Sequence, residues 1–496
     1  MASTQSLKDP KQLHVAMFPW LAFGHILPFL ELSKFITQKG HKVSFLSTTR
    51  NIRRLPSSHL SPLVNLVELT LPCVQELPQN AEATMDVHTD DVHYLKKAFD
   101  GLQPEVARFL EEESPDWIIY DFAPYWLPAV AAGLGISRAF FLIINAWFLA
   151  FVGSSPEDLI NGSDYRTKIE DFMTPPKWVP FPTKICYRKH EANWLVGSIS
   201  ANASGVSDAF RLGMTIKGSD CIFIRHCYEF EPQWLTILGE LHHLPVVPVG
   251  LMPPETPTNV GDEKDDAWIT VKKWLDCQQK GHMVYVALGS EVTVSKTELG
   301  ELALGLELSG LPFFWTLRKT AAGSANSTEL PDGFSERTRN RGVVWTSWVP
   351  QLQILSHESV GGFLTHCGWG SICEGLTFGH PLIMLPFLVD QGLNARAMVD
   401  KQVGIEVPRN EEDGSFTKAS GFTFTPVWTY DSRCKIGHML KMELHCGGYF
   451  GASLQPAMDE EEIFMQKLEV KKCTGQARLN KEKMHEVKRW GSYRRK

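Results

Sequence analysis

The chain has 496 residues, of which 43% are hydrophobic and 21% charged, a balance typical of globular proteins and not of disordered ones. That length exceeds what one hydrophobic core normally serves, so we expect two or three domains. The formal net charge of −7 gives no electrostatic basis for binding nucleic acid.

The N-terminal residues do not show the basic stretch followed by an apolar one that is typical of a signal peptide. The longest apolar run, 139–152, is interrupted by Asn145 and is too short to span a bilayer. The 10 cysteines are scattered, with neither a CxxC pair nor a Cys/His metal-binding spacing, and they indicate reduced thiols. We therefore expect a cytoplasmic protein with no transmembrane segment and no metal site.

Short apolar runs alternate with helical segments along the first part of the chain. Residues 14–20, 42–48 and 116–122 read as strands, and 27–40 has a helical spacing that stops at Gly40. Near-continuous apolar strands separated by helices predict a parallel sheet covered on both faces.

A proline-rich and then charged stretch, 245–266, separates this pattern from a second one like it. The strands expected in the second pattern are 283–290, 313–318, 343–349, 361–368 and 381–387, with a helix over 297–309. We interpret the chain as two doubly wound, Rossmann-like α/β domains, 1–245 and 281–419, joined by a linker, 246–280. Ligands bind at the carboxyl ends of such strands, so a cleft between the domains could hold two substrates.

The sequence FLTHCGWGSICEG combines the end of an apolar strand with the start of a helix. A helix N-terminus offers free N–H groups and the positive end of the helix dipole, which suits an anion. Gly368 and Gly370 let the backbone approach that anion, while His366 and Ser371 add donors. Glu374 lies one turn further on and could accept two ribose hydroxyls. The turn therefore favours a nucleoside diphosphate, with a glycine-rich turn capped by Ser371 as the simpler alternative.

The wider segment from Trp348 to Gln391 resembles the donor-binding signature of plant UDP-sugar-dependent glycosyltransferases. It carries, in order, W-x-P-Q, H-x-x-x-G-G-F-x-T-H-C-G-W, a glutamate, G-x-P and D-Q. The resemblance extends over residues 12–419. It looks most like the branch that adds a sugar to the sugar of a flavonoid, triterpenoid or steroid glycoside, such as soyasaponin and flavanone-glycoside rhamnosyltransferases. It implies the GT-B fold, inversion at the anomeric carbon, and no cofactor beyond the UDP-sugar co-substrate.

The resemblance assigns the UDP-sugar site, in chain order, to Ser290, Trp348, Val349, Gln351, His366, Gly368, Trp369, Gly370, Ser371, Glu374, Asp390 and Gln391. It implies that Trp348 stacks on uracil, an interaction worth roughly 1–3 kcal/mol, and that Asp390 and Gln391 bind sugar hydroxyls. Gly370 departs from the family, which has Asn or Ser there, so we expect weaker donor binding. Gln391 favours glucose across the family, but the most similar branch includes rhamnose users, so sugar and acceptor stay open.

Sugar transfer to a hydroxyl needs a base, and the pKa of histidine suits that task. His25 and Asp121 each follow a predicted strand of one parallel sheet, where a carboxylate can orient an imidazole. The resemblance makes His25 the base and Asp121 its partner, in an expected monomer whose acceptor is a small-molecule glycoside. Aromatic candidates for the acceptor pocket are Trp20, Phe122, Trp126, Phe141, Trp147 and Trp194.

Other enzyme classes lack their motifs. Neither GLGISR (133–138) nor GWGSIC (368–373) has the third glycine of a dinucleotide-binding G-x-G-x-x-G. The serine-hydrolase G-x-S-x-G and the P-loop lysine motif are also absent. The alternative left open is a catalytically weak or inactive family member that only binds UDP-sugar or metabolite.

That alternative depends on the C-terminal tail. We expect EEDGSFTKA (411–419) to open a helix, but in residues 420–455 glycines and a proline interrupt any helical period. We therefore expect this segment to be poorly ordered, the two halves to be loosely held and activity to be low. The charged residues after it, up to 496, indicate a solvated surface helix.

Overall fold

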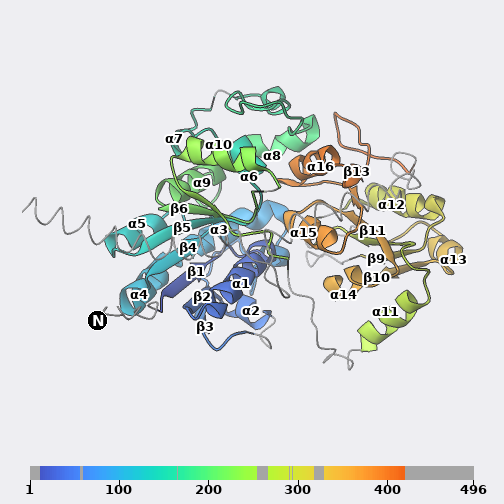
Figure 1. Ribbon diagram of the computed structural model, residues 1–496, viewed down its shortest axis with the longest axis horizontal. Helices are drawn as coiled ribbons and strands as arrows, with labels where there is room; N and C mark the ends of the chain where they lie inside the picture. The colour runs from blue at the N-terminus through green and yellow to red at the C-terminus, as the bar shows by residue number, and fades with distance from the viewer. Residues whose placement is uncertain are drawn as a thin grey trace, which may run out of the picture.

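The computed structural model describes residues 12–55, 60–164, 166–228, 230–253, 266–289, 291–292, 294–317 and 329–418. Within these ranges the chain forms two α/β halves that lie side by side (Figure 1). We call residues 12–253 the first half and 266–418 the second half. Ser290 and the tail 420–496 lie outside the described residues, so the expectations about them stay predictions.

The first half is built on a seven-stranded parallel sheet in the order β3-β2-β1-β4-β5-β6-β7. Its strands are β1 (His14–Phe18), β2 (Lys42–Thr48), β3 (Val64–Leu69), β4 (Trp117–Tyr120), β5 (Ser137–Leu142), β6 (Cys221–Ile224) and β7 (Val246–Pro248). Its α-helices are α1 (Phe23–Gln38), α2 (Thr49–Arg53), α3 (Val92–Asp100), α4 (Gln103–Glu113), α5 (Leu127–Gly133), α6 (Ala146–Val152), α7 (Pro156–Asn161), α8 (Lys189–Ile199), α9 (Asp208–Lys217) and α10 (Pro232–His242).

The second half repeats the plan with a six-stranded parallel sheet in the order β10-β9-β8-β11-β12-β13. Its strands are β8 (Met283–Ala287), β9 (Phe313–Thr316), β10 (Gly342–Trp345), β11 (Val360–Thr365), β12 (Leu382–Met384) and β13 (Gly404–Glu406). Its α-helices are α11 (Asp266–Asp276), α12 (Lys296–Ser309), α13 (Phe334–Thr338), α14 (Gln351–Leu355), α15 (Trp369–Thr377) and α16 (Gln391–Asp400). The expected pair of Rossmann-like halves is confirmed.

Both faces of the first sheet are buried, which explains its near-continuous apolar strands. Val15 and Met17 of β1 pack into the core on one face, while Ala16 and Phe18 pack into the core on the other. Because side chains alternate along a strand, covering both faces with helices requires apolar residues at 15–18, whereas His14 at the start of β1 is only half-buried.

The structure changes two expected boundaries. The range 246–280, expected as a linker, contributes β7 to the first sheet and α11 to the second half, where Trp274 packs on Phe314 at 5.9 Å between ring centroids. The short β7 forms the sheet edge, where proline is tolerated, so its proline-rich sequence read as a linker. Residues 411–418 form turns and no helix, and the expectation of a helix opening there is wrong for these residues.

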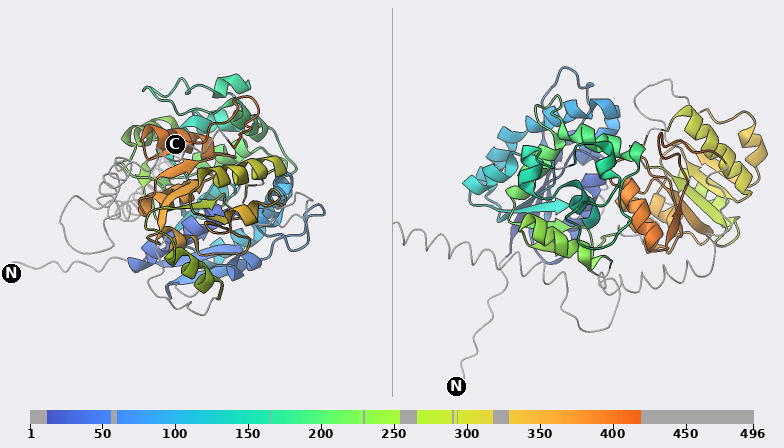
Figure 2. Two further views of the ribbon diagram at one scale, coloured as in Figure 1. Left: turned by 90° about the vertical axis from the view of Figure 1, so that its right-hand side faces the viewer. Right: turned by 90° about the horizontal axis from the view of Figure 1, so that it is seen from above.

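Each sheet reverses its strand order once, between β1 and β4 and between β8 and β11. These neighbouring strands end level with each other: Phe18 pairs with Tyr120, and Ala287 pairs with Thr365. The loops that leave such strands diverge to opposite faces of the sheet and open a crevice. In Figure 2, right, the orange helices of residues 369–400 lie on the side of the second half that faces the first half.

Candidate active site

His25 and Asp121 meet at the point where the first sheet reverses its strand order. Helix α1 starts four residues earlier than the sequence predicted, which places His25 in its first turn. Its Nδ1 lies 2.8 Å from Oδ2 of Asp121, the residue directly after β4. The same carboxylate accepts backbone N–H groups from Trp20 at 2.7 Å and from Ala123 at 3.1 Å.

These contacts define the state of the imidazole. A carboxylate held as an acceptor by two backbone N–H groups requires His25 Nδ1 to carry hydrogen, which leaves the lone pair on Nε2. The Asp121 side chain is 2% exposed and the His25 side chain 22% exposed, so the histidine reaches the surface while its partner is buried. The pair can therefore take a proton at Nε2 and stabilise the resulting imidazolium.

The aromatic residues expected around the acceptor divide into two groups. Those buried in the hydrophobic core are Trp20, Trp126, Phe141 and Trp147. Phe141 lies in the core on the other face of the sheet, against Phe29, so its expected place in the acceptor pocket is wrong. Phe122, half-buried, packs on the His25 ring at 5.6 Å, and the half-buried Trp194 stacks on Phe148.

The strand-to-helix turn predicted from the sequence is present. Strand β11 ends at Thr365 and α15 begins at Trp369. Gly368 is the N-cap of α15 and no side chain caps the helix, so the alternative that Ser371 caps it is wrong. The first N–H groups of α15 are therefore open to an anion, as the donor interpretation requires.

His366 lies in a narrow gap between two glycines: Gly368 of this turn and Gly289 of the loop after β8. A β-carbon on either Gly289 or Gly368 would fall 2.6 Å from His366 Nε2, so both positions need glycine. Burial lowers the pKa of His366 to about 4, which keeps the ring neutral near pH 7. Its buried Nδ1 has no hydrogen-bond partner among the described residues, and a bound diphosphate could supply one.

Gln351, expected at the uracil, and Glu374, expected at the ribose, are joined by a hydrogen bond. Gln351 Nε2 donates to Glu374 Oε2 at 2.6 Å, while Tyr285 OH donates to Gln351 Oε1 at 3.3 Å. Burial raises the pKa of Glu374, although the hydrogen bond from Gln351 lowers it. Trp348 is 66% exposed beside the buried Val349, so its indole face is open to stack on a base.

Gln391 and Asp390 begin α16 with their side chains oriented by the protein. Gln391 Oε1 accepts the N–H groups of residues 387 and 388, each at 2.9 Å, which fixes the orientation of its amide group. Burial raises the pKa of Asp390 to about 6, although the hydrogen bond from Asn394 and the positive charge of His25 both lower it. His25 of the first half therefore lies close enough to Asp390 of the second half for their charges to interact.

Asn394, which sequence reasoning missed, connects Asp390 and the turn after β11 with the first half. Its Nδ2 donates to Asp390 Oδ2 at 2.6 Å and to Cys367 O at 2.9 Å. Its Oδ1 accepts from Asn145 Nδ2 at 2.6 Å and Trp147 Nε1 at 3.0 Å, both in the first half. The only available signal was its position one helical turn after Asp390.

The two halves share a buried interface beside the donor turn. Trp369 Nε1 donates to Arg225 O at 2.9 Å, and its ring packs on Trp147 at 5.3 Å and on His226 at 5.9 Å. Burial lowers the pKa of His226 to about 3, so this aromatic stack is neutral near pH 7. These contacts need no residue of 420–455, and they argue against halves that are loosely held.

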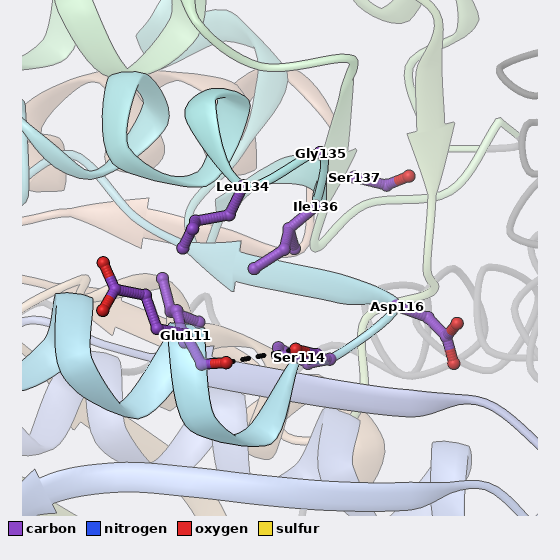
Figure 3. Close-up of a pocket in the computed structure, with 9 residues that line it drawn as sticks. Glu111, Ser114, Asp116, Leu134, Gly135, Ile136 and Ser137 are labelled. Carbon is purple, nitrogen blue, oxygen red and sulfur yellow. Dashed lines mark hydrogen bonds between the residues drawn. The ribbon is translucent and has the colours of Figure 1, made fainter. Parts of the chain in front are cut away.

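A separate cavity of about 360 Å³ lies elsewhere in the first half (Figure 3). Its lining residues are Leu110, Glu111, Ser114, Pro115, Asp116, Leu134, Gly135, Ile136 and Ser137. Asp116 precedes β4 and Ser137 begins β5, so the cavity opens at the amino ends of the strands. His25 and Asp121 lie at the carboxyl ends, and we assign the cavity no part in the reaction.

Comparison with known proteins decides the family. Residues 262–413 match the family model described as UDP-glucoronosyl and UDP-glucosyl transferase. UDP-glycosyltransferase 91D2 of Stevia rebaudiana is 66% identical, over 85% of this chain and 88% of its own length. The chain belongs to the UDP-glycosyltransferase family.

Further similarities locate this UDP-glycosyltransferase within known proteins. Soyasaponin III rhamnosyltransferase of Glycine max is 43% identical, over 83% of this chain and 86% of its own length. The Glycyrrhiza uralensis UGT solved with glycyrrhetinic acid 3-O-monoglucuronide matches with a TM-score of 0.74 at 20% identity, covering 97% of this chain and 100% of that chain. The structural match confirms the expected GT-B fold.

Three further observations concern the described part of this UDP-glycosyltransferase. No helix there is long and apolar enough to cross a membrane. The cysteines in the same ranges form no disulfide with one another. Of the expected donor residues, those of 348–351, 366–374 and 390–391 lie on the loops and helix starts at the carboxyl ends of the second sheet.

Proposed function

We propose that this UDP-glycosyltransferase transfers a sugar from a UDP-sugar, with inversion, to a hydroxyl on the sugar of a plant triterpenoid, flavonoid or steroid glycoside. The observation that carries the proposal is the His25–Asp121 pair, whose 2.8 Å contact leaves Nε2 free to accept a proton. The electrostatic proximity of His25 to Asp390 supports a reaction between the two halves.

The proposed reaction is one displacement. The acceptor hydroxyl gives its proton to His25 Nε2 as its oxygen bonds to the anomeric carbon, and the carbon–oxygen bond to UDP breaks with the electron pair leaving on the diphosphate. Asp121 stabilises the imidazolium. The N-terminus of α15 faces the charge that develops on the diphosphate, and no metal takes part in the step.

The donor assignments belong to the same proposal. Trp348, Val349 and Gln351 would hold uracil, and Glu374 the ribose. Asp390 as acceptor and Gln391 as donor would bind vicinal sugar hydroxyls, which matches the orientation of both side chains. Ser290, which follows β8 in the sequence and lies outside the described residues, would reach the phosphates.

Acceptors that already carry a sugar are favoured by two names among the similar proteins. The Glycine max relative is called a soyasaponin III rhamnosyltransferase, and the Glycyrrhiza uralensis structure contains a monoglucuronide. The contact between His25 and Asp121 and the uncapped start of α15 support an active enzyme over the alternative of an inactive binding protein.

The test is a matrix of donors and acceptors. Purified full-length protein is incubated with UDP-glucose, UDP-rhamnose and other UDP-sugars against glycosides and their aglycones, and products are detected by mass. We expect gain of one sugar on glycosides, and a β-glucoside from the α-linked UDP-glucose. Transfer to aglycones alone would overturn the acceptor class, and UDP binding without transfer to any acceptor would favour the inactive alternative.

A further inference from the structure

Arg225 carries a buried charge that forms no direct ion pair with a carboxylate of the described residues. It follows β6 in the first half, is 4% exposed, and forms no ion pair with any carboxylate in the described ranges. Its Nε donates to Leu251 O at 2.7 Å and its Nη2 to Met252 O at 3.0 Å. A buried guanidinium that is bonded only to neutral carbonyls is costly, which indicates that an anion completes the site.

The remaining nitrogen of Arg225 is directed at the donor turn. Nη1, which has no hydrogen bond to the described residues, lies 3.6 Å from the position that a β-carbon on Gly370 would take. The backbone oxygen of Arg225 accepts from Trp369 Nε1, so the arginine is anchored to the start of α15. Arg225 is also close enough to Glu374 for its charge to favour the ionised carboxylate.

We propose that Arg225 is a donor-binding residue that reaches from the first half to the UDP diphosphate and occupies the space left by the missing side chain of Gly370. Guanidinium groups bind phosphate oxygens through strong, charge-assisted hydrogen bonds. The N-terminus of α15 and Arg225 then contact the same anion from opposite halves. This inference rests on the proposed function, since it needs a UDP-sugar in that turn.

A purely structural role for Arg225 makes a different prediction, because loss of its bonds to Leu251 and Met252 would weaken every ligand alike. We therefore compare UDP with uridine, which lacks phosphate, in the full-length protein. Arg225→Gln keeps an amide donor for the carbonyls and removes the charge. We expect the Kd of UDP to rise by about tenfold or more, with the Kd of uridine unchanged.

Arg341→Gln is the matched control, since Arg341 also donates to backbone carbonyls, of Leu306 and Leu311, at a distance from the donor turn. It should leave both Kd values unchanged. Equal loss of UDP and uridine affinity in Arg225→Gln, or no loss of either, would overturn the inference.

A second measurement includes one variant in which Arg225 is unchanged. Gly370→Asn in the otherwise unchanged protein should not strengthen UDP binding, because Arg225 already fills that space. In the Arg225→Gln background the same substitution should restore UDP affinity. Stronger UDP binding by Gly370→Asn with Arg225 intact would refute the assignment. Wild-type protein that bound no UDP would instead refute the proposed function, and this inference with it.

Discussion

Asn145 and Asn394 belong to different halves of the chain and are joined by a buried hydrogen bond of 2.6 Å. Asn145 is also the N-cap of α6, where its Oδ1 accepts from Phe148 N. Asn394 passes the connection on to Asp390 and to Cys367 O. The position of the Asp390 carboxylate is thus tied directly to the first half.

Replacing the hub of this network tests that connection. Asn394→Leu leaves buried donors and acceptors unpaired, so we expect the free energy of unfolding to fall by about 1–3 kcal/mol. It should also weaken UDP-sugar binding more than UDP binding, because Asp390 loses its hydrogen bond. Denaturant unfolding and calorimetry measure the two effects.

The matched control for Asn394→Leu is Asn51→Leu. Asn51 is equally buried and hydrogen-bonded, to Thr48 and Glu82, but lies on α2 away from the donor turn. The Asn51→Leu variant should be less stable than the wild type, and its affinities for UDP and UDP-sugar should be unchanged. An Asn394 variant that weakened both ligands equally would mean that the network has no particular link to the sugar.

Loss of the proposed base should remove chemistry and leave donor binding intact. We expect His25→Ala to lower kcat by roughly 10²–10⁴-fold, the usual contribution of a positioned base, with the Kd of UDP unchanged. His14→Ala is the control, because His14 starts the same β1 strand at its opposite end and contacts Ser44. Near-normal turnover in His25→Ala would rule out the base assignment.

Substitutions of Glu374, proposed to bind ribose, and of Asp390, proposed to bind the sugar, should affect UDP and UDP-sugar affinity differently. Glu374→Ala should weaken UDP and UDP-sugar alike, by about 1–3 kcal/mol for a lost charged acceptor. Asp390→Ala should weaken UDP-sugar and leave UDP almost unchanged. Calorimetry with both ligands on both variants measures the four affinities, and an equal loss at Asp390 would place it outside the sugar pocket.

The raised pKa of Asp390 predicts a pH dependence of donor binding. Its pKa of about 6 means that the carboxyl becomes protonated as the pH falls through 6 and then no longer accepts as an anion. UDP-sugar affinity should therefore decrease between pH 7.5 and pH 5. Asp390→Asn should bind weakly at every pH, whereas His25→Gln should retain the decrease. A wild-type affinity independent of pH would show that the ionised carboxylate is not needed.

Two glycines of one turn should respond differently to the same substitution. Gly368→Ala forces a β-carbon within 2.6 Å of His366 Nε2, so we expect displacement of the histidine and a loss of about 1–3 kcal/mol in stability, with weaker UDP binding. Gly370→Ala meets Arg225 only at 3.6 Å, an ordinary contact, and should be stable. Thermal unfolding and UDP titration of both variants would test this, and equal effects would contradict the geometry.

Much of this arrangement could be predicted from the sequence, because it depends on local pattern. The apolar run that ends at Thr365 and the glycines after it set a strand-to-helix turn within a few residues. His25 and Asp121 follow strands, and strands of one parallel sheet bring their carboxyl ends to the same edge. The α/β class, the strand-to-helix turn and the proximity of His25 to Asp121 follow from such short-range signals.

Only the tertiary structure decided which residues meet across the halves. Arg225 and Trp369 are separated by 144 residues, and Asn145 and Asn394 by 249. No local sequence pattern around these residues predicts either contact. The two faces of β5 were equally hidden from the sequence. Phe140 packs into the core on one face of β5 and Phe141 into the core on the other. Because both faces are buried there, the apolar run 139–142 does not indicate which side chain lies on which face.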